Sequence, residues 1–152
     1  MRIIAIDPGW SGAVAFFKKG YLQRINNCPT SREPSEMAQI LKDNIGKKKP
    51  VVYIERVWAR PYERGAFSFG QNYGIWLGII ASLGLKRVDV LPKVWQKEIG
   101  NRIPKDYAKR KRYFKRRAQR WAGKKHKVTL INADAICIGM YALQEVKNGN
   151  RL

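Results

Sequence analysis

Residues 2–17 of the chain read Arg-Ile-Ile-Ala-Ile-Asp-Pro-Gly-Trp-Ser-Gly-Ala-Val-Ala-Phe-Phe. The start of this stretch is apolar without alternation, which is typical of a β-strand buried on both faces. Asp7 ends the run, and a Pro-Gly pair breaks the pattern before a second apolar run over 13–17. A carboxylate is therefore predicted at the mouth of a buried central strand. There it either caps a loop or binds something positive, because burying it alone is costly.

The composition indicates one folded domain. With 152 residues, 45% of them hydrophobic, we expect this domain over residues 1–147, followed by a tail over 148–152. Cys28 and Cys137 are far apart and in no metal-binding spacing, so we expect reduced thiols in a cytoplasmic compartment. We expect no signal peptide, and no apolar run approaches the ~20 residues of a membrane span.

The formal net charge of +20 indicates a polyanionic partner, because self-repulsion of this size destabilises a compact protein. Nucleic acid is the first candidate, an anionic membrane the second, and a surface charged only for solubility the third. The single histidine, His126, argues against catalysis that depends on an imidazole.

Three strands and then a helix are predicted at the start of the chain. The strands, over Arg2–Asp7, Ala13–Lys18 and Tyr21–Asn26, are joined by short turns and should form an antiparallel meander. Ser35 is predicted as the N-cap of a helix in which apolar residues recur at helical spacing up to Ile45.

A second fully apolar strand, Val51–Ile54, ends on Glu55. Since a helix precedes it, this strand should run parallel to its partner through a right-handed crossover. If that partner is the first strand, Asp7 and Glu55 lie side by side at one edge of the sheet. Two buried strands that both end on a carboxylate indicate a functional site more strongly than either strand alone.

A loop over 57–66 leads to a predicted helix, Phe67–Leu83, with Gly70, Gly74 and Gly78 on one stripe. Such a stripe lets another backbone approach closely, and either the protein's own sheet or a second copy of the chain would fit against it. The next predicted elements are a strand over Arg87–Leu91 and a short helical or irregular connector over 94–100, with Trp95 in the core.

The segment 102–127 carries thirteen Lys or Arg residues and a single acid. Its apolar residues recur at helical spacing, at Tyr107, Phe114, Ala118 and Trp121, so one stripe of a helix is apolar and the other faces are almost entirely basic. A merely solvated helix surface usually mixes both signs of charge, so this pattern favours binding to phosphates.

The last helix is predicted to begin at Asn132, which suits an N-cap, and to carry Asp134 in its first turn. The helix dipole stabilises an anion at this place. Asp134 therefore has a structural explanation as well as a functional one.

This order of elements resembles the α/β ribonuclease H-like fold, a five-stranded mixed sheet of three antiparallel and two parallel strands flanked by helices. In that superfamily, acids at the ends of the first and fourth strands and on the last helix converge on a pair of metal ions, and Asp7, Glu55 and Asp134 occupy these places. The motifs that extend the likeness are Ile-Asp-Pro-Gly at 6–9, Tyr-Ile-Glu-Arg at 53–56, Phe-Gly-Gln-Asn-Tyr-Gly-Ile-Trp-Leu-Gly at 69–78, Val-Leu-Pro-Lys-Val-Trp at 90–95 and Ala-Asp-Ala at 133–135. In these motifs the chain resembles the RuvC-type Holliday junction resolvases, including phage RuvC-like proteins and plant chloroplast resolvases.

The resemblance implies a structure-selective endonuclease that cuts four-way DNA junctions in recombination and repair and leaves 5′-phosphate and 3′-hydroxyl ends. Asp7, Glu55 and Asp134 would be its catalytic residues and the ligands of two Mg²⁺ ions, with Mn²⁺ able to replace Mg²⁺. The family usually has a further Asp or His three positions before the last-helix acid. That position is Ile131 here, which cannot bind a metal, and Asn132 and His126 are the remaining candidates.

The resemblance also implies how DNA is held. An aromatic residue just past the second acid enters the junction centre in RuvC proteins; Trp58 fits this part, with Tyr62 as second choice. Basic residues early in the basic helix approach the cleaved strand, so Lys105 or Lys109 would neutralise the phosphate. The predicted DNA-binding residues are Trp58, Arg60, Tyr62, Lys105, Lys109, Arg110, Arg112, Lys115, Arg116 and Arg117.

Two cuts in opposing strands require two active sites, so the resemblance implies a homodimer with Gly70, Gly74 and Gly78 at its interface. We expect it to act on branched DNA in the cytoplasm, in a nucleoid or a phage-infected host, without a membrane partner. One alternative is an actin-like or sugar-kinase ATPase, for which 152 residues are too few. Others are a ribonuclease H-like nuclease for RNA–DNA hybrids or forks, and a non-catalytic DNA-binding module, which Ile131 suggests.

Overall fold

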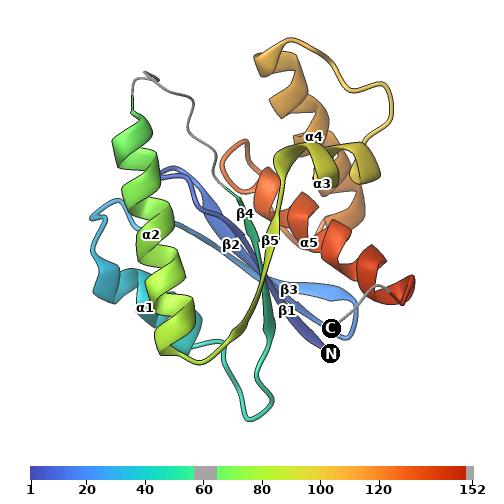
Figure 1. Ribbon diagram of the computed structural model, residues 1–152. Helices are drawn as coiled ribbons and strands as arrows, with labels where there is room; N and C mark the ends of the chain where they lie inside the picture. Colours follow the sequence, from blue (N-terminus) through green and yellow to red (C-terminus); the bar gives the residue numbers. More distant parts are fainter. Residues whose placement is uncertain (57–64, 150–152) are drawn as a thin grey trace.

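The computed structural model describes residues 1–56 and 65–149 and shows a five-stranded mixed sheet between two layers of helices (Figure 1). The strand order is β3–β2–β1–β4–β5. The first three strands are antiparallel, and β4 and β5 run parallel to β1, so the predicted fold class is confirmed. The strands are β1 (Arg2–Asp7), β2 (Ala13–Lys18), β3 (Tyr21–Asn27), β4 (Val51–Glu55) and β5 (Lys86–Val90).

Strand β1 is the centre of the sheet, between β2 and β4. Its side chains alternate between two hydrophobic cores: Ile3 and Ala5 face one, and Ile4 and Ile6 face the other. This burial on both faces explains why the sequence of β1 is apolar without alternation. The same holds for β4, which pairs with β1 in parallel register up to Ile54.

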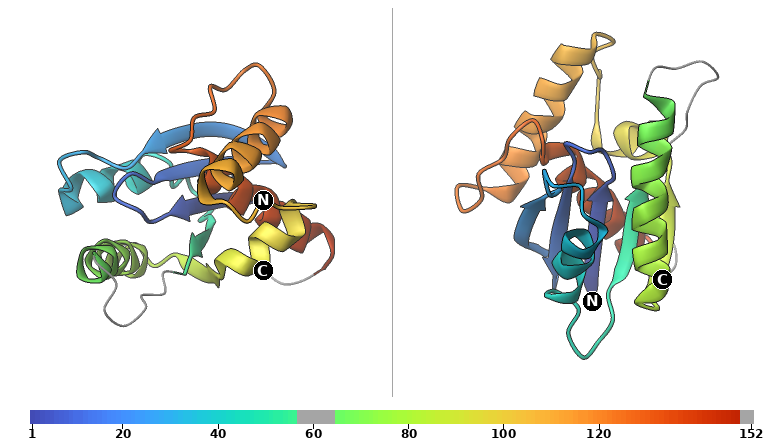
Figure 2. Two further views of the ribbon diagram at one scale, coloured as in Figure 1. Left: turned by 90° about the horizontal axis from the view of Figure 1, so that it is seen from above. Right: turned by 90° about the vertical axis from the view of Figure 1, so that its left-hand side faces the viewer.

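Helices α1 and α2 cover one face of the sheet, and α3, α4 and α5 cover the other (Figure 2). Helix α5 packs against the middle of the sheet, where Gly139 permits close contact: a Cβ atom at this position would overlap the ring of Phe17. The helices are α1 (Pro34–Lys42), α2 (Ala66–Ser82), α3 (Pro92–Ile99), α4 (Tyr107–Ala122) and α5 (Ala133–Lys147).

The predicted start of α1 at Ser35 is wrong. The helix begins at Pro34, whose fixed φ suits the first turn, and Glu33 is the N-cap residue, so Ser35 lies inside the helix. The helix also ends at Lys42, before Ile45. Of the two forms predicted for the connector over 94–100, the helical one is correct: it is helix α3, which begins earlier than predicted because Pro92 both ends the preceding strand and opens the helix.

The apolar stripe predicted in the basic segment is correct only from its middle onward. Phe114 and Ala118 of α4 are buried, and Trp121 packs against Phe17 with ring centroids 5.6 Å apart. Tyr107, in contrast, is 65% exposed and lies in the first turn of α4, two turns before the buried Phe114.

Both cysteines are free and buried, as predicted, but in different cores: Cys28 lies on the α1–α2 side of the sheet and Cys137 on the α5 side. The sheet between them prevents a disulfide. Within residues 1–56 and 65–149, no helix is both long and apolar enough to cross a membrane.

Candidate active site

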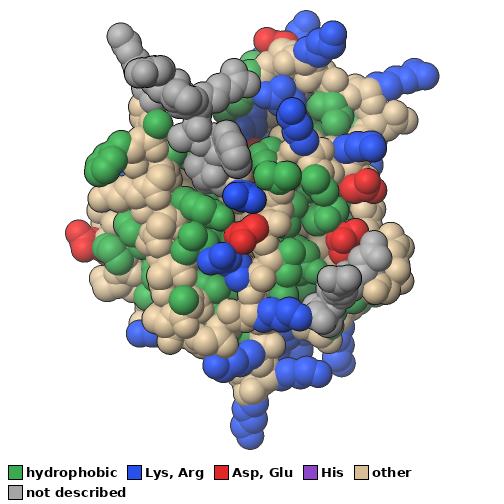
Figure 3. Space-filling model, in the orientation of Figure 1, with side chains coloured by type: hydrophobic (Ala, Val, Ile, Leu, Met, Phe, Trp, Pro, Cys, Tyr) green, Lys and Arg blue, Asp and Glu red, His purple; other side chains and the backbone are tan. Residues whose placement is uncertain are grey.

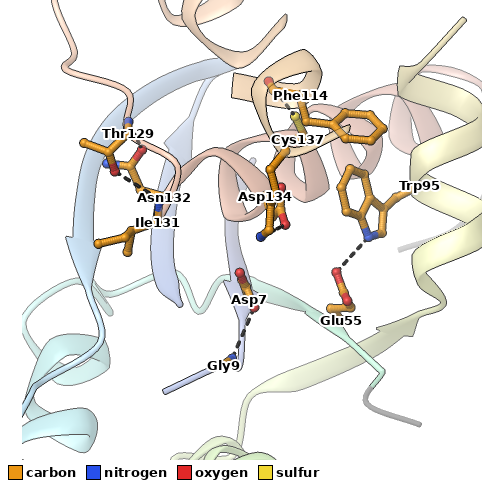
Figure 4. Close-up of polar contacts among 11 residues, drawn as sticks. Asp7, Gly9, Glu55, Trp95, Phe114, Thr129, Ile131, Asn132, Asp134 and Cys137 are labelled. Atoms are coloured by element: carbon orange, nitrogen blue, oxygen red, sulfur yellow. Dashed lines mark hydrogen bonds and ion pairs between the residues drawn. The ribbon is translucent and has the colours of Figure 1, made fainter. Parts of the chain in front are cut away.

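The structure brings Asp7, Glu55 and Asp134 to the same edge of the sheet (Figure 4). Asp7 is the last residue of β1 and Glu55 the last of β4, and these neighbouring strands are parallel, so their carboxyl ends meet. Asp134 comes from the first turn of α5, which packs across β1. The three carboxylates thus reach one space from three elements, as the sequence predicts.

A tight turn orients Asp7. Its Oδ1 accepts a hydrogen bond from the backbone N–H of Gly9 at 3.1 Å, and the N–H of Gly12 donates to the carbonyl of Gly9 at 2.8 Å. A Cβ atom on Gly12 would overlap the backbone carbonyl of Asp7. Only glycine therefore allows the chain to return so close to the end of β1.

Helix α2 holds the same turn from the other side. The side-chain amide of Asn72, which is buried, donates to the carbonyl of Pro8. The indole N–H of Trp10 donates to the hydroxyl of Ser68. The loop after Asp7 is thus fixed to two successive turns of α2.

Glu55 is oriented by an indole. Nε1 of Trp95, in α3, donates to Oε2 of Glu55 at 2.9 Å. Trp95 is fully buried and its ring meets that of Phe114 edge-on, with centroids 4.9 Å apart. The sequence predicts Trp95 as a core residue, which is correct, but its hydrogen bond to Glu55 depends on how α3 folds back over β4 and is not visible in the sequence.

Asp134 is paired with a lysine that is absent from the predicted site residues. Nζ of Lys111, in α4, lies 2.5 Å from Oδ2 of Asp134. The second oxygen, Oδ1, is buried and has no hydrogen-bond partner among the described residues. Lys111 shares a helix face with Phe114 and Ala118, three and seven residues further on, and this spacing is the signal that would have placed it toward the core.

Burial and mutual repulsion alter the acidity of the first two acids. Burial, with the charge of Asp134 as a smaller cause, raises the pKa of Asp7 to about 6. Burial, and then the charge of Asp7, raises the pKa of Glu55 to about 8. Such shifts mean that the site is short of positive charge, although Lys111 already contributes one.

Among the described residues, no group of three or more His, Cys, Asp or Glu side chains is arranged to hold a metal ion. The acids face one another, but Trp95 and Lys111 occupy an oxygen of Glu55 and of Asp134. A cation at the paired oxygen of Asp134 would have to displace the ammonium of Lys111.

The two candidates for a further ligand have other partners. Asn132 occupies the N-cap position of α5, as predicted, but within residues 1–56 and 65–149 no side-chain hydrogen bond caps the helix. Its Oδ1 instead accepts a hydrogen bond from the backbone N–H of Thr129 in the preceding loop, at 2.8 Å. His126 contacts the carbonyl of Leu22 in β3 at 3.2 Å, at the far side of the sheet from Glu55. Ile131, at the family's acidic position, is 42% exposed.

The predicted DNA-binding residues fall into two groups. Trp58, Arg60 and Tyr62 lie outside the described residues. The other predicted residues form a basic surface on α4 and on the segment just before it. Asp106, in this segment, is the N-cap residue of the helix. Exposed members are Lys105, Lys109, Arg112 and Arg116, while Arg110, Lys115 and Arg117 are half-buried.

The glycine stripe of α2 does not pack against the sheet. A Cβ atom at Gly70, Gly74 or Gly78 would meet no described residue within 4 Å, and all three glycines are exposed. Nearby Phe67 and Phe69 are exposed as well. Of the two interpretations that the sequence allows, packing against the protein's own sheet is therefore wrong.

No family model and no curated protein matches the sequence. Solved structures do match the fold. T. thermophilus RuvC in complex with a Holliday junction substrate superposes with a TM-score of 0.72 at 15% sequence identity, over 99% of this chain and 98% of that chain. A further Thermus thermophilus RuvC structure gives a TM-score of 0.66 at 16% identity over the same shares. The chain therefore has the RuvC fold over nearly its whole length.

Proposed function

We propose that the protein is a structure-selective DNA endonuclease that resolves four-way junctions in recombination and repair by metal-dependent hydrolysis of phosphodiester bonds. The observation that carries this proposal is the convergence of three half-buried or buried carboxylates at one sheet edge, next to the basic helix α4. The likeness to a RuvC structure that is bound to a Holliday junction supports the choice of substrate.

The donor set suits Mg²⁺, which prefers carboxylate oxygens and keeps several of its waters, so few protein ligands suffice. Oδ1 of Asp134, which has no hydrogen-bond partner among the described residues, and the raised pKa values of Asp7 and Glu55 fit a site that is completed by cations. We propose that the three acids would hold two Mg²⁺ ions, which Mn²⁺ can replace. Bound ions would activate a water and neutralise the leaving 3′ oxygen, which gives a 5′-phosphate and a 3′-hydroxyl.

The chain's own residues prepare the acids for this task. The N–H of Gly9 fixes one oxygen of Asp7 and leaves the other toward the shared space. The indole of Trp95 fixes Glu55 in the same way. Because both donors belong to well-buried or tightly turned segments, the acids are held in place before the substrate arrives, which lowers the cost of reorganisation.

Basic residues of α4 would bind the phosphates of the junction arms. A four-way junction is recognised by its shape, so contacts to the backbone should dominate over contacts to bases. We propose Lys105, Lys109, Arg110, Arg112, Lys115, Arg116 and Arg117 for these contacts, together with Arg60 and the aromatic Trp58 or Tyr62 at the junction centre.

We also propose a homodimer that forms through the open glycine stripe of α2. Two opposed cuts need two active sites, and a smooth apolar helix stripe with no described neighbour allows a second backbone to approach closely. The dimer would work where branched DNA occurs, in a nucleoid or in the cytoplasm of a phage-infected host.

The proposal is tested with a panel of labelled four-way junction, fork, duplex and RNA–DNA hybrid, each with Mg²⁺, with Mn²⁺ and with a chelator. We expect metal-dependent, paired cuts in the junction and much weaker cleavage of the other substrates. Preferred cleavage of the hybrid or the fork would make the protein a different nuclease of the same fold. Binding without any cleavage in either metal would make it a non-catalytic module.

A further inference from the structure

Lys111 holds a position that none of the other basic residues of α4 holds in the described structure. Its ammonium lies 2.5 Å from Asp134, and the two side chains are only 26% and 13% exposed. Its charge also acts on Asp7 and Glu55, in each case lowering the pKa that burial raises. This ammonium is therefore the resident counter-charge of the three acids.

The ion pair occupies a metal-binding oxygen. A divalent ion that used Oδ2 of Asp134 would have to replace the lysine ammonium, because two cations cannot share this oxygen at contact distance. An ion that used only Oδ1 would lie next to a fixed positive charge. In either case Lys111 opposes binding of an ion to Asp134.

A hollow of about 620 Å³ opens beside this lysine. Lys111 and Arg112 line it together with three exposed apolar or aromatic side chains, Tyr107, Leu130 and Ile131. Two cations beside an aromatic ring and apolar walls match the chemistry of a nucleotide, whose phosphate is anionic and whose sugar and base present flat apolar surfaces. Lys111 lines the hollow and also reaches Asp134, so the hollow adjoins the acids.

We propose that this hollow receives a nucleotide of the substrate strand, whose phosphate draws Lys111 away from Asp134 and so frees this carboxylate for a divalent ion. The inference rests on the proposed nuclease function. It adds that the substrate strand binds before the divalent ion at Asp134. Ile131 contributes to this arrangement in two ways. It is an apolar wall of the hollow, and it provides no charge for Asp134, whose described ionic partner is Lys111.

The coupling between DNA binding and ion binding acts in both directions. If DNA lowers the cost of binding the ion, the ion must strengthen the binding of DNA by the same factor. Free protein would load its second ion poorly, and the complete site would form only on a bound strand. Lys111 then acts as a positioning residue for Asp134 and, after it has moved, as a phosphate contact.

The first test measures Mn²⁺ binding to the DNA-free protein by titration calorimetry. Replacing Lys111 with Met should strengthen the weaker of the two binding events by about tenfold, because the competing ammonium is gone. The matched control is Arg120→Met, which removes the same charge from an exposed position of the same helix, outside the proposed DNA contacts, and should leave Mn²⁺ affinity unchanged. If the Lys111→Met protein binds Mn²⁺ as the wild type does, the inference is wrong.

Removing Lys111 leaves a buried carboxylate without its partner and could destabilise the fold. Lys111→Gln therefore serves as a second variant, since its amide can still donate a hydrogen bond to Asp134 without a charge. Thermal unfolding of each variant identifies a folded sample. Either folded variant with stronger Mn²⁺ binding supports competition, and unchanged binding in the folded Lys111→Gln protein contradicts it.

The second test measures coupling. Fluorescence anisotropy with a labelled four-way junction, in Ca²⁺ and with strand integrity checked on a gel, gives DNA affinity with and without the ion. We expect Ca²⁺ to tighten junction binding by about five- to tenfold in the wild type and by a clearly smaller factor in Lys111→Met. The same factor in both proteins would overturn the inference.

Occupation of the hollow is tested with Tyr107→Ala, which removes an exposed ring and leaves the Lys111–Asp134 pair in place. This variant should weaken the coupling between Ca²⁺ and DNA while DNA-free Mn²⁺ binding stays as in the wild type. Unchanged coupling would place the nucleotide elsewhere and contradict the inference. Failure of the proposed function looks different: neither the wild type nor the variants would bind Mn²⁺ or cut a junction.

Discussion

Helices α2 and α4 lie on opposite faces of one sheet and both present long surfaces to solvent, yet they share almost no chemistry (Figures 1 and 2). Helix α2 contains no charged residue, and its exposed stripe consists of Gly70, Gly74 and Gly78 beside phenylalanines. Helix α4 contains eight Lys or Arg and no acid. On the face seen in Figure 3, hydrophobic side chains lie over α2 and also to the right of the centre, while Lys and Arg project near the start of α4 and at the opposite end of the molecule.

The difference indicates two kinds of partner. A charged face stays hydrated and attracts a polyanion over a distance, whereas an apolar, glycine-lined face gains free energy only when another surface covers it closely. The carboxylates of Asp7, Glu55 and Asp134 lie between the two helices, at the edge that both reach. This difference is what the proposed DNA surface on α4 and the proposed dimer surface on α2 rest on.

The largest expected effect is a loss of cleavage that leaves DNA binding and dimerisation unchanged. Asp7→Asn should reduce junction cleavage by at least about a thousandfold, because it removes a charge of the proposed metal site. The asparagine oxygen can still accept the hydrogen bond from Gly9, so the turn should persist. Gel-shift binding of the junction and the dimer mass should both remain as in the wild type. Cleavage at the wild-type rate would exclude Asp7 from the mechanism.

The next effect tests α4 as the DNA surface. Reversing the charge of exposed Arg112 and Arg116 to Glu should weaken binding to all DNA shapes by about 10- to 100-fold. It should also reduce the slope of log K against log salt by roughly 0.9 for each phosphate that is no longer neutralised. The matched control reverses Lys47 and Lys48, exposed residues in the loop before β4, at the end of the sheet opposite the acids. If both double variants weaken binding equally, only net charge matters and the α4 surface is not the DNA track.

A smaller effect tests α2 as the surface for a second copy. Gly74→Leu should shift the dimer toward monomer by about tenfold or more in Kd, because a side chain would hold the two helices apart. In a single chain the same change should raise stability by up to ~1 kcal/mol, since glycine is a poor helix former and the added side chain meets no described neighbour. Light scattering and thermal unfolding measure the two results, with Gln39→Leu on α1 as a control. If the Gly74→Leu protein dimerises as tightly as the wild type, the interface lies away from this stripe.

The smallest effect concerns stability of the metal-free protein. Burial raises the pKa of Glu55 from 4.5 to about 8. Between pH 4.5 and pH 8 the folded state therefore keeps a proton on Glu55 that the unfolded state has lost. The free energy of unfolding should then fall as the pH rises through this range. Glu55→Gln removes this loss. At pH 8 the variant should be more stable than the wild type by on the order of 2 kcal/mol, and at pH 5 the difference should nearly vanish.

Thermal unfolding at both pH values checks this prediction. Saturating Mg²⁺ should abolish the advantage of the variant, because the ion stabilises the ionised glutamate of the wild type. Glu98→Gln, at an exposed glutamate of α3, should change little at either pH. A Glu55→Gln protein that is less stable than the wild type at pH 8 would contradict the charge shortage inferred for the site.

The three acids could be predicted because each lies at a place that simple rules determine. Two of them end apolar strands joined by a crossover, which must be parallel and must therefore bring Asp7 and Glu55 together. The third follows the start of an apolar helix. Their partners are harder to predict: Trp95 reaches Glu55 only through the path of α3, which depends on the tertiary fold.

Lys111 shows what a charge-based view of the sequence misses. It belongs to a run of four consecutive basic residues, 109–112, and charge alone does not distinguish it from its neighbours. Its spacing from Phe114 and Ala118 turns it inward, while Arg112 next to it points out. Tyr107 is the opposite error, since helical spacing predicts burial but the ring, in the first turn of α4, is exposed.

The two hydrogen bonds between α2 and the loop after Asp7 have a mechanical consequence. Ser68 and Asn72 sit on the helix whose outer stripe is free for a neighbour, and they hold Trp10 and Pro8 on its inner side. A displacement of this helix would therefore be passed across one helix diameter to the turn that follows Asp7. If two copies of the chain pair through α2, this one helix would connect the dimer interface of each subunit with its Asp7 turn.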